Sequence, residues 1–70
     1  MRYVEFRDLI HEELRRNPAG RTWVELKERL ALPYDRPCPT WVARLEQEIG
    51  LSRAKHSGPA LIWTIRESAA

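Results

Sequence analysis

Three prolines occur within seven residues, at Pro33, Pro37 and Pro39, and they divide the chain. Proline fixes its own φ, lacks a backbone N–H and disfavours the helical conformation in the residue before it. The segment 32–39 is therefore predicted to be extended or turn-like. It separates whatever folds before it from whatever folds after it.

Two helices are predicted before this segment. The first covers about residues 3–16, where apolar residues recur at the spacing of one helical face. These residues are Tyr3, Phe6, Leu9, Ile10 and Leu14. Residues 17–20, Asn-Pro-Ala-Gly, end this helix. The second helix covers about residues 23–31, and Thr22 and Glu25 have the spacing of a capping box at its start.

A third helix is predicted over about residues 40–49, directly after the prolines. Thr40 is its expected N-cap and Gly50 its C-terminal stop. The sequence Thr-Trp-Val occurs at 22–24 and again at 40–42. We interpret the two occurrences as two helix starts capped in the same way. The residues expected on the inner side of the third helix are Trp41, Val42, Leu45 and Ile49.

Near the C-terminus, apolar residues recur at every second position instead of at helical spacing. Leu61, Trp63 and Ile65 alternate with the residues between them, which predicts a strand with one face on the core. Residues 51–56 are expected to pair with it, so that a β-hairpin covers about residues 51–66. Residues 20–21 are expected to add a third short strand. The sequence thus predicts one α+β domain over residues 1–70.

Composition supports a compact domain. The hydrophobic share is 43%, and it includes three Trp, two Tyr and one Phe, which excludes a disordered chain. The longest apolar run, residues 60–63, is far shorter than the roughly 20 residues of a membrane span. Charged residues near the N-terminus argue against a signal peptide. We therefore expect a cytoplasmic protein with no membrane partner.

The sequence has no pattern typical of a catalytic site. Cys38 is the single cysteine, so it can form neither an internal disulfide nor a shared zinc site. His11 and His56 are remote from it in sequence and give it no adjacent base. Gly-rich phosphate loops and metal-ligand clusters are absent from the sequence. We expect a protein that is not an enzyme and that has no metal or cofactor.

The arrangement resembles a winged helix-turn-helix domain. The resemblance rests on residues 22–26 at the start of the second helix, on residues 40–49 in the recognition-helix position, and on the hairpin around Gly58 as the wing. Residues 32–42 are also similar to small bacterial winged-helix proteins. The link between the second and third helices, about residues 32–39, is twice the usual length for this motif. The resemblance implies double-stranded DNA as the partner, and a transcriptional or mobile-element accessory role.

The third helix is the expected reader of DNA. With its apolar residues turned inward, Thr40, Ala43, Arg44 and Gln47 fall along one exposed stripe. Arg44 has the chemistry to address guanine and Gln47 to address adenine, while Ala43 permits close approach. Thr40, at the start of the helix, can donate to a phosphate. These four residues are the predicted groove-facing set.

The surplus of positive charge is C-terminal. Residues 1–50 hold nine basic and nine acidic residues, so the net charge of +2 comes from residues 51–70. Arg53, Lys55 and His56 lie on the first arm of the hairpin, where they are expected to contact phosphates. Arg21 and Arg36, in the loops flanking the second helix, are further phosphate candidates.

A protein-interaction module is the competing interpretation, because winged helices also serve as docking domains. The small net charge favours it, as do Glu46 and Glu48, which would repel phosphate. Tyr34 is expected either to fill the long loop against the first helix or to lie exposed in an interface. A homodimer is a further possibility under either interpretation.

Overall fold

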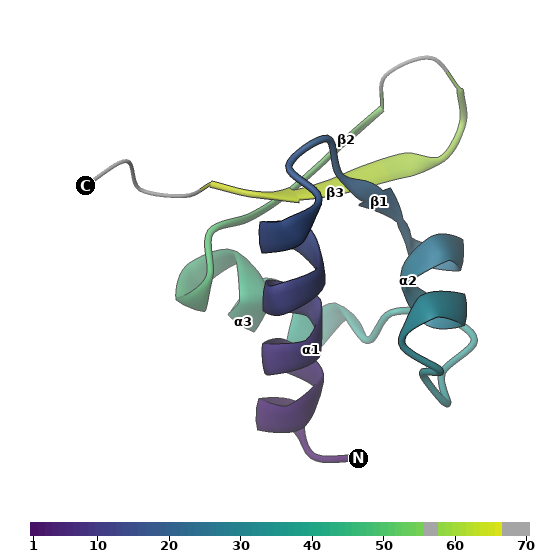
Figure 1. Ribbon diagram of the computed structural model, residues 1–70. Coiled ribbons are helices and arrows are strands. Elements are labelled where there is room, and N and C mark those ends of the chain that lie inside the picture. The colour runs from purple at the N-terminus through teal and green to yellow at the C-terminus, as the bar shows by residue number, and fades with distance from the viewer. Residues whose placement is uncertain (56–57, 67–70) are drawn as a thin grey trace.

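The computed structural model describes residues 1–55 and 58–66 and shows an α+β domain (Figure 1). The helices of this part of the chain are α1 (Tyr3–Arg16), α2 (Trp23–Arg29) and α3 (Pro39–Glu48). Its strands are β1 (Arg21–Thr22), β2 (Leu51–Lys55) and β3 (Leu61–Ile65). They form an antiparallel sheet in the order β1-β3-β2.

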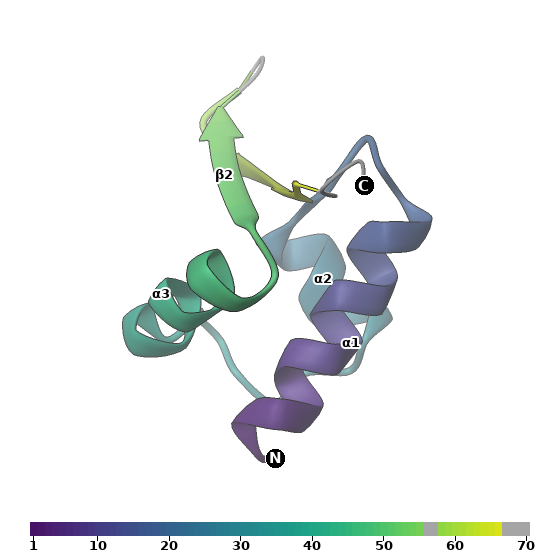
Figure 2. The same ribbon diagram turned by 90° about the vertical axis from the view of Figure 1, so that its left-hand side faces the viewer.

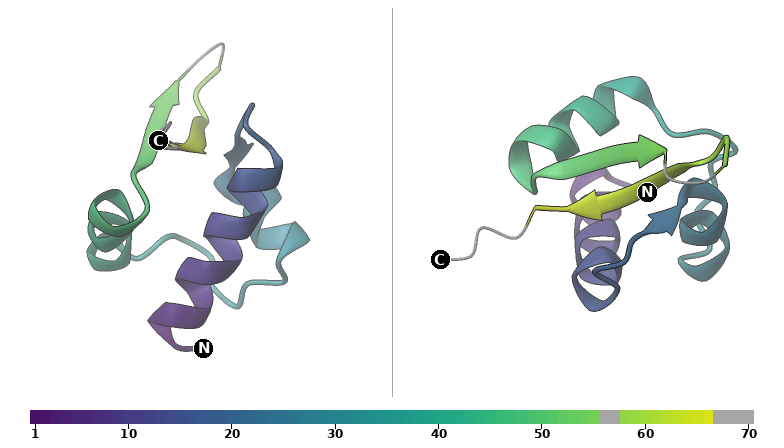
Figure 3. Two further views of the ribbon diagram at one scale, coloured as in Figure 1. Left: turned by 60° about the vertical axis from the view of Figure 1, so that its left-hand side comes forward. Right: turned by 90° about the horizontal axis from the view of Figure 1, so that it is seen from above.

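The sheet lies on one side of the helices (Figures 1 and 3). β3 is its central strand, and the register places Trp63 opposite Arg21 on one side and opposite Arg53 on the other. The Trp63 side chain is only 1% exposed, and its ring stacks on that of Trp23 at a centroid distance of 5.4 Å. The predicted alternation is confirmed, since Leu61 and Ile65 pack against the same core.

The core is formed mainly by α1 and by the inner faces of the other elements. Its most fully buried side chains are Trp63, Phe6, Ile10, Leu14, Leu26 and Leu45. Leu9, which was expected in the core, is 38% exposed, so that prediction is wrong. At 3.6 residues per turn, Leu9 lies roughly a quarter turn from the middle of the buried stripe, so the neighbouring elements cover it only in part.

The predicted capping box begins α2. Thr22 Oγ1 accepts a hydrogen bond from the Glu25 N–H, and the Glu25 carboxylate accepts one from the Thr22 N–H. The helix ends at Arg29 and not at the predicted residue 31. Ala31 has a left-handed φ of 52°, and the Leu32 N–H turns back to the Lys27 carbonyl, which closes the helix before the proline segment.

The start of α3 differs from the prediction. Cys38 is the N-cap and makes no side-chain capping hydrogen bond, while Pro39 occupies the first turn. Proline suits this position because its fixed φ is that of a helix and because a backbone N–H here would have no acceptor within the helix. Thr40 is therefore inside the helix and not its cap. The two Thr-Trp-Val segments begin their helices in different ways.

The predicted third strand is present, one residue later than expected. Gly20 has a φ of 95° and turns the chain from α1 into β1. A Cβ at this position would lie 2.5 Å from Ile62 Cγ2 and 2.8 Å from the Trp63 carbonyl oxygen. Only glycine fits such a conformation this close to β3. Gly20 therefore allows β1 (Arg21–Thr22) to pair with the central strand.

We predict that Trp63→Ala lowers the free energy of unfolding by about 3–5 kcal/mol, because it opens a large cavity where the sheet meets the helices. Chemical denaturation followed by circular dichroism measures the change. Val24→Ala is the control, since that side chain is 55% exposed. A Trp63→Ala protein that unfolds at the wild-type denaturant concentration would show that the sheet does not depend on this contact.

Candidate nucleic-acid interface

The outward face of α3 carries the four residues that were predicted to form one stripe. Thr40, Ala43, Arg44 and Gln47 are all exposed, and together they line a shallow hollow of about 320 Å³. Their spacing of three, four and seven residues puts them on one side of the helix. Val42 and Leu45 anchor the opposite side in the core. In Figure 2 and in the left view of Figure 3, α3 lies at one side of the molecule, with α1 and α2 to its right.

Glu48 does not lie on this stripe but is directed toward α1. Arg7 Nη1 donates to Glu48 Oε1 at 2.9 Å, and Arg44 Nη2 donates to Glu48 Oε2 at 3.2 Å. The Tyr3 hydroxyl donates to the same carboxylate at 3.3 Å. The hydrogen bond from Arg7, followed by that from Arg44, lowers the pKa of Glu48. Two guanidinium groups therefore share the Glu48 carboxylate, and Arg7 also pairs with Asp8 at 3.1 Å, so the charges of these four residues balance.

Arg44 is held at the α1 side of the stripe. Its Cζ lies 4.0 Å from the centroid of the Tyr3 ring, a cation–π contact, in addition to the ion pair with Glu48. Its side chain is nonetheless 52% exposed. The guanidinium is thus oriented by α1 while it remains accessible to solvent.

Arg53 and Lys55 are exposed on β2, the strand that follows α3 directly (Figure 2). Gly50, at φ 69°, makes the turn between the two elements. Arg53 lies opposite Trp63 in the sheet, and its Cζ is 5.5 Å from the Trp63 ring centroid. His56 lies outside the described residues. The stripe and the two basic residues of β2 thus come from consecutive elements of the chain.

The structure separates Arg21 from Arg53 and Lys55. Arg21 lies on β1, at the sheet edge opposite β2. Its guanidinium donates to Glu13 at 3.2 Å and to Asn17 at 2.6 Å, and the side chain is only 23% exposed. Arg29 donates to the same Glu13 carboxylate at 2.8 Å. Arg21 therefore takes part in a network that ties α1, β1 and α2 together.

Arg36 is exposed in the loop before α3. Tyr34, from the same loop, packs edge-on against Phe6 and Trp41, and its hydroxyl donates to the Met1 carbonyl at 3.4 Å. Of the two expectations for Tyr34, the structure thus shows the one in which it fills the loop against α1.

Arg7 is the site residue that the sequence analysis missed. It lies on α1, 41 residues before Glu48, and no spacing rule connects the two. They meet because the Tyr3 ring packs edge-on against Trp41 at 5.4 Å and brings the first turn of α1 beside α3. Only the tertiary packing reveals this partner.

Within residues 1–55 and 58–66, no group of three or more His, Cys, Asp or Glu side chains could hold a metal ion. No helix of the same part of the chain is both long and apolar enough to cross a membrane.

Comparison of the chain with protein-family models, with curated proteins and with solved structures finds no match. The function is therefore inferred from the geometry of α3, β2 and the side chains around them.

We predict that Glu48→Gln destabilises the fold at neutral pH and that its effect disappears in acid. The pKa of Glu48 lies below its ordinary value of 4.5 in the folded protein. Its contribution is therefore fully present above that value and is lost as the pH falls through the depressed pKa. Thermal melts of both proteins between neutral and acid pH measure the difference in Tm.

Glu46→Gln is the matched control on the same helix, because Glu46 is exposed and takes part in none of the ion pairs described above. Its difference in Tm from the wild type should not vary with pH in this way. A Glu48→Gln difference that stays constant down to acid pH would contradict the role given to the Arg7–Glu48–Arg44 cluster.

Proposed function

We propose that this chain is a small DNA-binding protein of the winged-helix type. In this proposal α3 enters the major groove, and the β2–β3 pair acts as the wing on the phosphate backbone. The observation that carries the proposal is the stripe of Thr40, Ala43, Arg44 and Gln47, which is exposed and contains no acidic residue. It is followed directly by the basic strand β2.

The residues of the stripe have distinct roles in the proposal. Arg44 donates to the O6 and N7 acceptors of a guanine, and Gln47 makes paired hydrogen bonds to an adenine. Ala43 is small enough for the helix to approach the base edges. Thr40, in the first turn of α3, donates to a phosphate and fixes the register.

Arg44 can exchange its intramolecular partner for DNA at small cost. Its ion pair with Glu48 and its cation–π contact with Tyr3 are both partly exposed, and exposed contacts of these kinds contribute little. When Arg44 leaves, Glu48 keeps its 2.9 Å bond to Arg7. No unpaired carboxylate then faces the DNA backbone from this side of the helix.

The phosphate contacts of the proposal are sequence-independent. Arg53 and Lys55 supply them from β2, with His56 after them in the chain, and Arg36 supplies one from the loop before α3. Arg21 is the weakest member of the predicted set, because contact with a phosphate would compete with its bonds to Glu13.

So few phosphate contacts give weak binding by a monomer. Affinity useful at physiological salt then requires a dimer on two half-sites or a tethered partner protein. Within this proposal, the biological role is that of a transcriptional or mobile-element accessory factor.

A second candidate function is docking to another protein. It is favoured by four large apolar side chains that are exposed on the helices and at the chain start: Met1, Val4, Leu9 and Val24. Such residues are common singly on monomers, and they form part of many interfaces when grouped. Failure to bind DNA at low salt would favour this candidate.

The proposal predicts binding of mixed-sequence duplex DNA, measured by fluorescence anisotropy between about 50 and 200 mM salt. With about three to five phosphate contacts, log K should fall against log salt with a slope near −3 to −4. Arg53→Ala combined with Lys55→Ala should weaken binding to all sequences alike and should reduce the slope by about one to two units.

Arg15→Ala combined with Arg16→Ala is the matched control. It removes the same charge from the last turn of α1, where both residues pair with Glu12. For this variant, the slope of log K against log salt should stay close to that of the wild type. Equal losses in the two double variants would mean that net charge alone, and not β2, attracts the DNA, and absence of binding at about 50 mM salt would refute the proposal.

Arg44→Ala tests base reading on a duplex selected for tight binding. Loss of a paired contact to guanine should reduce the difference in binding free energy between this duplex and an unrelated one by about 1–3 kcal/mol. The control is Arg7→Ala, which disturbs the same carboxylate without removing a residue of the stripe. If Arg44→Ala weakens both duplexes equally, Arg44 contacts phosphate and does not read a base.

A further inference from the structure

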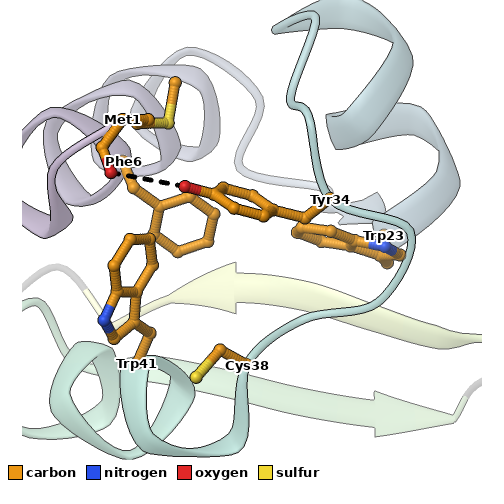
Figure 4. A pocket seen from close by; sticks show the side chains of 6 residues that line it. All are labelled: Met1, Phe6, Trp23, Tyr34, Cys38 and Trp41. Carbon is orange, nitrogen blue, oxygen red and sulfur yellow. Dashed lines mark hydrogen bonds between the residues drawn. The ribbon is translucent and has the colours of Figure 1, made fainter.

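An aromatic pocket lies on the side of the helices where α1 begins (Figure 4). Its volume is about 290 Å³. It is lined from the first turns of α1, α2 and α3 and from the loop between α2 and α3 that holds Pro33 and Pro37, here called the proline loop. The lining residues are Met1, Phe6, Trp23, Tyr34, Cys38 and Trp41.

The walls of this pocket are aromatic rings held by one hydrogen bond and by contact with one another. Trp23 Nε1 donates to the Asp35 carbonyl at 2.9 Å, which fixes the indole against the proline loop. The rings of Tyr34 and Trp41 meet edge-on at 5.7 Å. Phe6, only 1% exposed, lies 5.0 Å from Trp41 and 6.1 Å from Tyr34 between ring centroids. Such rings have few rotatable bonds, and these contacts limit how far the side chains that line the pocket can rearrange.

The proline loop explains why the space stays open. With Pro33, Pro37 and Pro39 the backbone between α2 and α3 has few accessible conformations, so it spans the gap without closing over it. Trp41 is carried by the first turn of α3, which Pro39 begins. The pocket is therefore formed before any ligand arrives, which lowers the entropic cost of binding.

The lining determines the class of ligand. It contains no Asp, Glu, Lys or Arg side chain, so a charged group entering it would lose hydration without meeting a charged side chain. Aromatic walls favour a flat ring, which can meet them face-on or edge-on. An apolar cavity of about 150 Å³ is enough for benzene, and this one has about twice that volume.

We propose that this pocket binds a small, neutral, planar aromatic molecule of one or two fused rings. The site shares no residue with the stripe of α3 or with the basic residues of β2. It therefore does not depend on DNA binding, and either proposal can fail without the other.

Cys38 makes the site measurable, since it is the only cysteine of the chain, is exposed and lies at the rim of the pocket. The probe is naphthol, which is neutral at neutral pH. Saturating naphthol should slow alkylation of Cys38 by iodoacetamide several-fold. In NMR spectra of the isotope-labelled protein, naphthol should shift the indole N–H signals of Trp23 and Trp41. The signal of Trp63, which does not line the pocket, should shift less.

Two comparisons make the test specific. Naphthoate has the same rings with one negative charge, and it should bind at least about tenfold more weakly. Tyr34→Ala removes one wall and should also weaken naphthol binding about tenfold. Tyr34→Phe keeps the ring and Val24→Ala lies outside the pocket, so both should bind naphthol as the wild type does.

Three outcomes would overturn the proposal. Naphthol up to its solubility limit could leave both the alkylation rate and the indole signals unchanged. Naphthoate could bind as well as naphthol, which would show non-specific adsorption. Cys38 could become protected without any probe as the protein concentration rises, which would show that a second copy of the chain fills the pocket. The wild-type indole spectrum decides the matter even where Tyr34→Ala fails to fold.

Discussion

The burial of Phe6 against three other aromatic rings is the contact on which the rest of the structure depends. Phe6 comes from α1, and its partners Trp23, Tyr34 and Trp41 come from α2, the proline loop and α3. Helices of 7 and 10 residues have little stability alone, so tertiary contacts of this kind must supply it. The same contacts fix α3 relative to α1 and hence the direction in which its outer face points.

Local patterns in the sequence predict most of the elements. The spacing of Tyr3, Phe6, Ile10 and Leu14 predicts α1, the capping box at Thr22 predicts the start of α2, and the alternation around Trp63 predicts β3. The same patterns do not locate boundaries that depend on single residues. Ala31, in a left-handed conformation, ends the turn after α2, and Pro39 begins α3 although Thr40 has the better side chain for a cap.

The candidate interface was predictable in its composition but not in its electrostatics. Helical spacing places Thr40, Ala43, Arg44 and Gln47 on one face because that inference needs only one helix. Arg7, by contrast, reaches Glu48 across the junction of α1 and α3, and this pairing changes the charge beside the stripe. In the sequence, Glu48 argues against DNA binding. In the structure it is directed toward α1 and paired with Arg7 and Arg44, which weakens that objection for Glu48 and leaves it unchanged for Glu46.

We propose that α3 and β2 together form the surface that binds DNA. Chemical-shift mapping of the labelled protein with a short mixed-sequence duplex, near 50 mM salt, tests it most directly. We expect the largest changes at the backbone amides of Thr40, Ala43, Arg44 and Gln47, with smaller changes along β2 and none around Glu12 at the far end of α1. Changes confined to other surfaces, or no changes at saturating duplex, would contradict the claim.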